Sequence, residues 1–191
     1  MTEPIYVVSG LPRSGTSMMM QMLTAGGIDP LTDGVRVADD DNPRGYYELE
    51  VVKKLPAETA FLDRAGGKVV KIVSELLLHV PLDRNYKVVF MRRPMGEVMR
   101  SQQAMLQHRD TVDGADDAMM RRAFQLHIDE VEQFCKSQDC IEILYVSYAR
   151  AVADPARQAG RVAEFIDRGL DVERMVEAVV PSLHRNKGEG E

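Results

Sequence analysis

The sequence predicts an α/β protein in three layers, with a central parallel sheet between two layers of helices. Short apolar runs alternate along the chain with longer segments of helical periodicity. The apolar runs, such as KVVKIV and YKVVFM, contain few polar residues, as expected of parallel strands that are buried on both faces. The length of 191 residues suits one domain with a sizeable core. We therefore expect a single domain over residues 1–183, followed by a flexible tail at 184–191.

Four segments are predicted as strands because each is short, apolar and bounded by polar or turn-forming residues. They are residues 5–9, 68–73, 86–91 and 141–146. Residues 29–47 lie between the first helix and the next element and are rich in Asp, Gly, Pro and Asn. Long irregular loops of this kind in compact domains are often functional.

The helices are predicted from periodicity and from the placement of Pro and Gly. The first follows the first strand and ends at Gly26-Gly27. Residues 48–65 are expected to be helical, with a break or kink at Pro56. The other predicted helices are 94–108, 115–138, 155–168 and 171–180. The 115–138 segment has one apolar stripe at spacings of three and four residues, formed by Met120, Phe124, Ile128, Val131 and Cys135.

Composition excludes several classes of protein. Acidic residues exceed basic ones by 30 to 24, which argues against a general nucleic-acid-binding protein because such proteins need a basic face. The two cysteines have a C-x4-C spacing that matches no common zinc pattern, so no metal site is expected. The low number of cysteines indicates a reducing compartment, and together with a start without a basic leader and the lack of a long apolar run it indicates the cytoplasm, with no membrane span.

The most informative segment is the turn after the first strand, GLPRSGTS at residues 10–17. A strand, a Gly-containing turn and a helix N-terminus aim backbone N–H groups at one point, where the helix dipole favours an anion. The pattern is close to the nucleotide-binding motif G-x-x-x-x-G-K-[ST]. Here, however, Thr16 replaces the lysine that reaches the β- and γ-phosphates, and the cation is Arg13. We expect this loop to bind a phosphate or sulfate; a turn without a ligand is the alternative.

A second strand also leads into a cationic turn and a helix, in VVFMRRPMGEVMRSQ at residues 88–102. Ser101 follows Arg93 by eight residues, a spacing that could bring both side chains to one phosphate. Taken alone, this pattern is better explained by a charged strand end and an ordinary helical serine. Next to the first loop, the phosphate-binding interpretation is favoured.

The two motifs together resemble those of sulfotransferases that use 3′-phosphoadenosine 5′-phosphosulfate (PAPS). Their loop pattern P-[KR]-S-G-T-[TS] is matched by Pro12, Arg13, Ser14, Gly15, Thr16 and Ser17. Their second motif, an Arg with a Ser eight residues later, is matched by Arg93 and Ser101. Residues 42–50 (NPRGYYELE) also look like bacterial members of this group. In that family Pro usually stands two residues after the Arg, and this leaves Arg92 as an alternative to Arg93.

The resemblance implies a P-loop-like α/β fold and in-line transfer of a sulfuryl group from PAPS to a hydroxyl or amine, with no metal required. It implies that the 12–17 loop holds the 5′-phosphosulfate, that Arg93 and Ser101 hold the 3′-phosphate, and that Arg13 acts in catalysis. The acceptor could be a small molecule, a glycan or a peptide. The segments 29–47 and 106–118 are expected to shape its pocket. The oligomeric state cannot be derived from the sequence.

The chain departs from this family at the catalytic base. Many cytosolic members have Lys-x-His on the strand after the acceptor loop, whereas this chain has Lys71-Ile72-Val73. Lys71 therefore remains as a candidate site cation, with a lysine that caps the strand for solubility as the equal alternative, and the base must come from elsewhere. The candidates are Glu48, the first choice, and Asp33, Glu50 and His79. The segment Arg185-Asn186-Lys187-Gly188 is similar to a terminal phosphate contact of the family, with a mobile tail as the alternative.

Two other functions remain open at this stage. A P-loop kinase or nucleotide hydrolase is disfavoured because the motif lysine and a clear strand-end Asp for a metal are both missing. A non-catalytic relative that binds a nucleotide is the other alternative, suggested by the short chain and the absent histidine.

Overall fold

The computed structural model describes residues 3–36, 45–108 and 117–180. In this part of the chain, four strands form one parallel sheet in the order β2-β1-β3-β4. The strands are β1 (Ile5–Gly10), β2 (Val69–Lys71), β3 (Tyr86–Arg92) and β4 (Ile141–Ser147). Gly10 pairs with Met91, and Arg92 pairs with Ser147, so the carboxyl ends of β1, β3 and β4 meet at one edge of the sheet.

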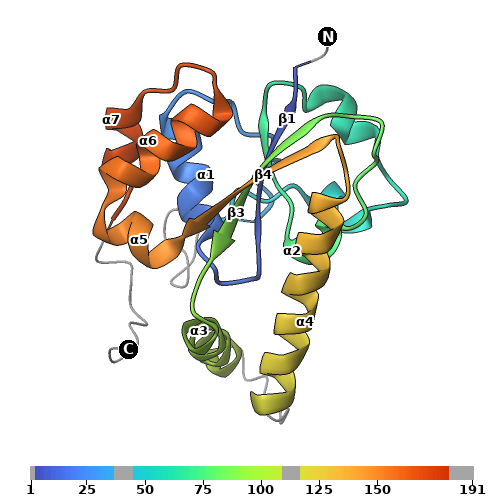
Figure 1. Ribbon diagram of the computed structural model, residues 1–191, viewed down its shortest axis with the longest axis vertical. Helices are drawn as coiled ribbons and strands as arrows, with labels where there is room; N and C mark the ends of the chain where they lie inside the picture. The colour runs from blue at the N-terminus through green and yellow to red at the C-terminus, as the bar shows by residue number, and fades with distance from the viewer. Residues whose placement is uncertain (1–2, 37–44, 109–116, 181–191) are drawn as a thin grey trace.

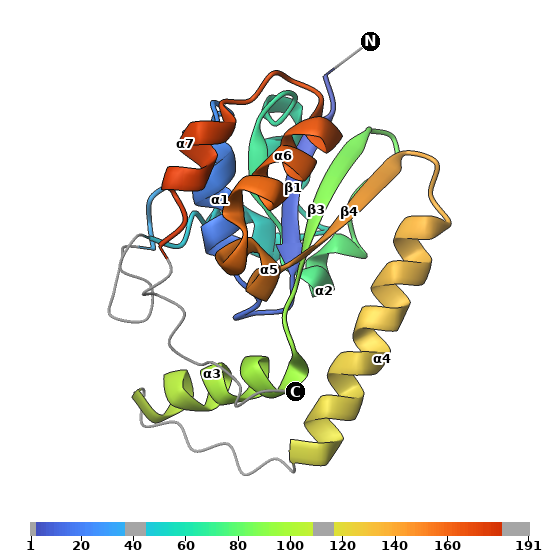
Figure 2. The same ribbon diagram turned by 60° about the vertical axis from the view of Figure 1, so that its left-hand side comes forward.

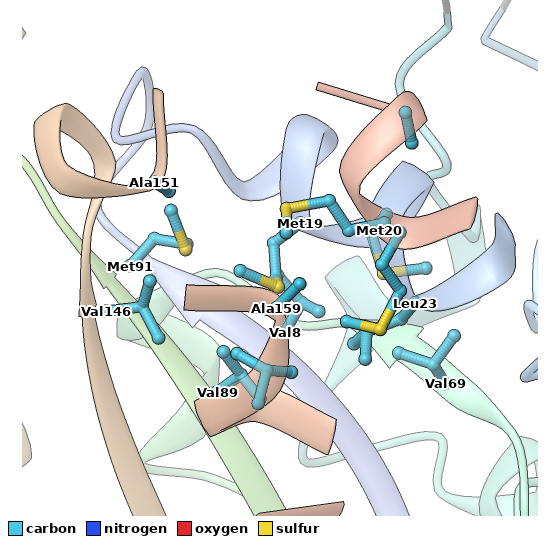
Figure 3. Packing of buried hydrophobic residues seen from close by; sticks show 14 of the residues in the cluster. Val8, Met19, Met20, Leu23, Val69, Val89, Met91, Val146, Ala151 and Ala159 are labelled. Carbon is cyan, nitrogen blue, oxygen red and sulfur yellow. The ribbon is translucent and has the colours of Figure 1, made fainter. Parts of the chain in front are cut away.

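One face of the sheet is covered by four helices, as Figures 1 and 2 show. They are α1 (Thr16–Ala25), α5 (Tyr148–Ala153), α6 (Pro155–Ile166) and α7 (Val172–Glu177). Figure 3 shows how Met19, Met20 and Leu23 of α1 pack on Val8 and Val69 of the sheet. All five side chains are fully buried. Methionine side chains adapt readily to irregular gaps, which explains their number in this layer.

The other face is covered by η1 (Glu50–Lys54), η2 (Ala60–Arg64), α2 (Ser74–Leu77) and α4 (Asp117–Lys136). Its core includes Phe90 of the sheet, Leu62 of η2, Leu77 of α2 and Val131 of α4. The predicted three-layer α/β/α architecture with a central parallel sheet is therefore confirmed. No helix in the described ranges is both long and apolar enough to cross a membrane.

Helix α3 (Met95–His108) and the amino-terminal half of α4 extend past the carboxyl edge of the sheet (Figure 2). The stripe predicted on α4 is accordingly buried only in part. Val131 and Cys135 are fully buried against the sheet, whereas Met120, Phe124 and Ile128 are half-buried. A helix that runs beyond the sheet has nothing there to bury its apolar face completely.

One local prediction is wrong, and two short helices were not predicted. Residues 48–65 were expected to be helical, but they form the two short 3₁₀ helices η1 and η2, with Pro56 between them. Proline offers no N–H to continue a helix, so the segment breaks into turns instead of kinking. Residues 74–77 form α2 and residues 148–153 form α5, and neither helix was predicted. Both helices are too short to show a period in sequence.

Candidate functional site

The turn between β1 and α1 is built on three residues with positive φ: Gly10 (145°), Arg13 (70°) and Gly15 (99°). Gly15 is also the N-cap of α1, and neither a capping side chain nor an acidic residue satisfies the first turn of this helix. The N-terminal N–H groups and the helix dipole therefore favour an anion at this end. Ser14 lies in the same turn with 1% of its surface exposed, and its Oγ has no hydrogen-bond partner in the described part of the chain. Such an orphaned hydroxyl fits a site that is completed by a ligand.

The second motif meets this turn. Arg13 Nε donates to Ser101 Oγ at 2.9 Å, and Arg93 Nη1 donates to the Arg13 carbonyl oxygen at 3.1 Å. Ser101 is 2% exposed. Arg93 is further held by Glu97 at 2.8 Å and lies over the Tyr148 ring, 4.6 Å from its centroid. The structure thus brings Arg13, Arg93 and Ser101 together at the carboxyl edge of the sheet.

Arg92 points elsewhere. It forms an ion pair with Glu132 of α4 and lies over the Tyr145 ring, 4.0 Å from the centroid. Neighbouring residues of an extended chain project to opposite faces, so only one of the two arginines can face the β1–α1 turn. That residue is Arg93.

Lys71, at the end of β2, forms the other half of the site. Its Nζ donates to the Tyr46 carbonyl oxygen at 2.9 Å and to Ser17 Oγ at 3.3 Å, and lies 3.5 Å from Glu48 Oε1. Burial lowers the pKa of Lys71, and the charges of Arg36 and Arg13 lower it further, whereas Glu48 opposes the shift. Lys71 therefore links the anion-binding turn to Glu48.

Among the other candidate bases, none lies next to Lys71. Asp33 accepts hydrogen bonds from the backbone N–H groups of Glu50 (2.6 Å) and Val35 (3.0 Å), and these bonds lower its pKa. Its position indicates a structural role in the turn. Glu50 pairs with exposed Lys53 at 2.6 Å, and His79 is exposed beyond α2. The geometry therefore favours Glu48.

Several residues of the site were not found from the sequence. Tyr148 is 7% exposed and lies between Arg93 and Gly15, where a Cβ added to Gly15 would come within 2.3 Å of the ring. Tyr46 and Arg36 adjoin Glu48 and Lys71. The only signal for Tyr148 was its position directly after the fourth apolar strand, at the edge where parallel strands end.

A pocket of about 190 Å³ lies between the turn, β3, α3 and α4. Its lining is mixed: the apolar side includes Leu11, Phe90 and Ile128, and the polar side includes Arg93, Gln125 and Glu132. Part of the loop 29–47, part of the segment 106–118 and all of Arg185 to Gly188 lie outside the described residues. Within those that are described, no group of three or more His, Cys, Asp or Glu could hold a metal ion.

Comparisons with known proteins agree with this geometry. A family model described as a sulfotransferase domain matches residues 3–186. No curated protein matches the chain significantly. Among solved structures, the sulfotransferase domain from the curacin biosynthetic pathway superposes with a TM-score of 0.55 at 12% identity. The match covers 96% of this chain and 83% of that one; at this identity it shows a shared fold and no more.

Proposed function

The chain belongs to the sulfotransferase domain family, and we propose that it transfers a sulfuryl group from PAPS to a hydroxyl or amine acceptor. The observation that carries this proposal is the meeting of Arg13, Arg93 and Ser101 beside an uncapped helix N-terminus. The β1–α1 turn, which carries Arg13, is suited to a phosphosulfate, and the pair of Arg93 and Ser101 is suited to a second phosphate. A donor with phosphates at two positions needs both of these binding sites.

In this proposal the turn from Pro12 to Ser17 holds the 5′-phosphosulfate end of the donor, and Arg93 and Ser101 hold the 3′-phosphate. The orphaned Ser14 Oγ, and the first turn of α1 with no side-chain cap and no acidic residue, support the first assignment. The position of Arg93 beside Arg13, with Arg92 bound to Glu132, supports the second. When bound, PAPS supplies the activated sulfuryl group.

Three side chains have catalytic roles in this scheme. Arg13 and Lys71 stabilise the negative charge that develops near the turn, because fixed cations in a water-poor site are effective there. Glu48 removes the proton of the acceptor. Since the two cations supply the positive charge, the proposed route needs no metal.

The acceptor is a small molecule, or a hydroxyl or amine of a glycan or peptide. The pocket beside Leu11 and Ile128, which has both apolar and charged walls, adjoins the turn and is a candidate for part of the acceptor-binding site. On the sequence evidence, we expect the reaction to take place in the cytoplasm.

A thermal shift experiment tests donor binding. The 3′,5′-bisphosphate nucleotide at 100 times its Kd should stabilise the protein by about 2.7 kcal/mol. Transfer of labelled sulfate from PAPS to a pool of phenols, alcohols and amino sugars tests the reaction. Arg13→Ala should lower kcat by about 10²–10³-fold, as the loss of one charge-stabilising donor does.

Two results would contradict the proposal. Stabilisation by magnesium and ATP, but not by the bisphosphate, would favour a kinase or nucleotide hydrolase. Tight bisphosphate binding without transfer to any acceptor in the pool would favour a non-catalytic nucleotide-binding relative.

A further inference from the structure

Arg36 is in an unusual environment for a side chain of a surface loop. Its guanidinium lies over the Tyr46 ring, with Cζ 3.4 Å from the ring centroid. Nη1 of the same group donates to Glu48 Oε1 at 2.8 Å. The side chains of Arg36 and Glu48 are 31% and 18% exposed. A fully exposed ion pair contributes little and is loosely held, but an aromatic face on one side and a carboxylate on the other fix this guanidinium in place.

The two oxygens of Glu48 are held differently. Oε1 is contacted by Arg36 at 2.8 Å and by Lys71 at 3.5 Å. For Oε2, the nearest cation recorded among the described residues is exposed Lys53 at 3.9 Å, beyond hydrogen-bond distance. A carboxylate that takes a proton needs one oxygen open toward the acceptor and the other fixed. In Glu48, Oε1 is held by two cations, whereas the contact of Oε2 among the described residues is the longer ion pair with exposed Lys53.

Tyr46 organises both contacts to Oε1. Its ring supports Arg36, and its carbonyl oxygen accepts the hydrogen bond from Lys71 at 2.9 Å. Lys71 Nζ also lies 5.8 Å from the centroid of the same ring. Tyr46 is only 5% exposed, so it is itself fixed by packing. One buried residue thus sets the positions of the two cations that orient Glu48.

We propose that Arg36, supported by Tyr46, is a positioning residue that holds Glu48 Oε1 and directs Oε2 to the acceptor. This inference rests on the proposed sulfuryl transfer. Oε2 takes the proton from the acceptor hydroxyl as its oxygen bonds to sulfur, and the electron pair of the breaking sulfur–oxygen bond stays on the 5′-phosphate. Arg36 does not touch the reacting atoms and acts only through Glu48.

The test combines activity with nucleotide binding. Arg36→Ala should lower kcat for sulfate transfer by about 10- to 100-fold, a large part of what a general base contributes. The Kd of the 3′,5′-bisphosphate should stay within about twofold. Because lysine lacks the flat guanidinium, Arg36→Lys should restore only part of the rate, whereas methylguanidinium added to Arg36→Ala should restore more. Tyr46→Phe, which keeps the ring, should retain activity, and Tyr46→Leu should lose it.

Two comparisons decide whether Arg36 acts through Glu48. The double variant Arg36→Ala/Glu48→Gln should be no slower than Glu48→Gln alone, within about twofold, because coupled residues are not additive. Arg84→Ala is the matched control: Arg84 has 29% side-chain exposure and a 2.8 Å ion pair to Asp63, and it lies just before β3, at the amino end of the sheet. It should leave kcat unchanged.

The outcomes separate the two proposals. No transfer by the wild-type chain overturns the proposed function and this inference with it. Transfer by the wild type with equal kcat in Arg36→Ala, or additive losses in the double variant, overturns the inference alone.

Discussion

At the scale of single residues, three arginines at the candidate site each make different contacts. Arg13 bonds to Ser101, Arg93 bonds to the backbone of Arg13, and Arg92 binds Glu132 on the other face of the chain. Arg93 is also backed by Tyr148 and paired with Glu97. Its guanidinium is therefore fixed before any ligand arrives, so little conformational entropy remains to be lost on binding.

This arrangement predicts selective losses of nucleotide affinity. Arg93→Ala should weaken binding of the 3′,5′-bisphosphate by about 1.5–3 kcal/mol, the usual cost of losing a charge-assisted contact. The same variant should weaken binding of 5′-AMP much less, because 5′-AMP lacks the 3′-phosphate. Arg92→Ala is the matched control and should change neither Kd measurably. Titration calorimetry with both nucleotides measures the difference. Equal losses for the two nucleotides would mean that Arg93 does not contact the 3′ group.

The sequence could predict this part of the site because each residue stands at the end of an apolar strand or in the helix that follows. Parallel strands end at the same edge, so Arg13, Arg93 and Ser101 had to converge there. The roles of Asp33, Arg36 and Tyr46 could not be predicted in this way. Asp33 fits the pattern of a catalytic carboxylate, yet its two oxygens accept backbone hydrogen bonds. Those contacts depend on the path of an irregular loop, which has no period in sequence.

At the scale of elements, the ends of helices were predicted better than the connections between strands. Asp154 and Asp171 accept hydrogen bonds from the N–H groups of Arg157 and Arg174, as N-cap residues do. These caps mark the starts of α6 and α7 in the sequence. Residues 48–65, by contrast, fold into 3₁₀ turns because Leu55, Phe61 and Leu62 reach the core from either side of Pro56. The conformation of this segment was therefore decided by tertiary packing together with the missing N–H group of Pro56.

Gly15 of the β1–α1 turn lies against Tyr148 of α5, and a matched pair of glycine substitutions tests whether this contact matters. Gly15 and Gly27 have nearly equal φ values of 99° and 106°, which an alanine adopts at a cost of about 1–2 kcal/mol. A Cβ at Gly27 would have no neighbour within 4 Å, whereas a Cβ at Gly15 would overlap the Tyr148 ring. Gly27→Ala should therefore lower the free energy of unfolding by the backbone cost alone.

Gly15→Ala should lower the free energy of unfolding more than Gly27→Ala does, since the backbone must shift away from Tyr148. It should also lower the affinity for the bisphosphate nucleotide by about tenfold or more. Urea denaturation and calorimetry measure the two effects. Equal destabilisation with unchanged affinity would show that the contact between the turn and α5 is not needed.

At the scale of the whole molecule, the sheet with its two covering layers is a compact body, and α3 and α4 extend from its carboxyl edge (Figure 2). The two layers have separate cores, one around Met19 and Val162 and the other around Phe90 and Leu62. Helix α4 belongs to the second core only through its carboxyl-terminal half, where Val131 and Cys135 are buried. In the preceding half, Met119 is 73% exposed and Leu126 is 60% exposed.

Amide hydrogen exchange should reveal this difference as a gradient along α4. Local opening is easiest where few apolar contacts must be broken, so amides at 120–126 should exchange at least about ten times faster than those at 131–136. Helix α6 is the control, because Ala159, Val162 and Ile166 bury its length against the sheet, and its central amides should be protected like those of the slow half of α4. Uniform protection along α4 would mean that its exposed half is held by contacts outside the residues described. A gradient would show that the amino-terminal half of α4, which lines the pocket beside Ile128, opens more readily than the half packed on the sheet.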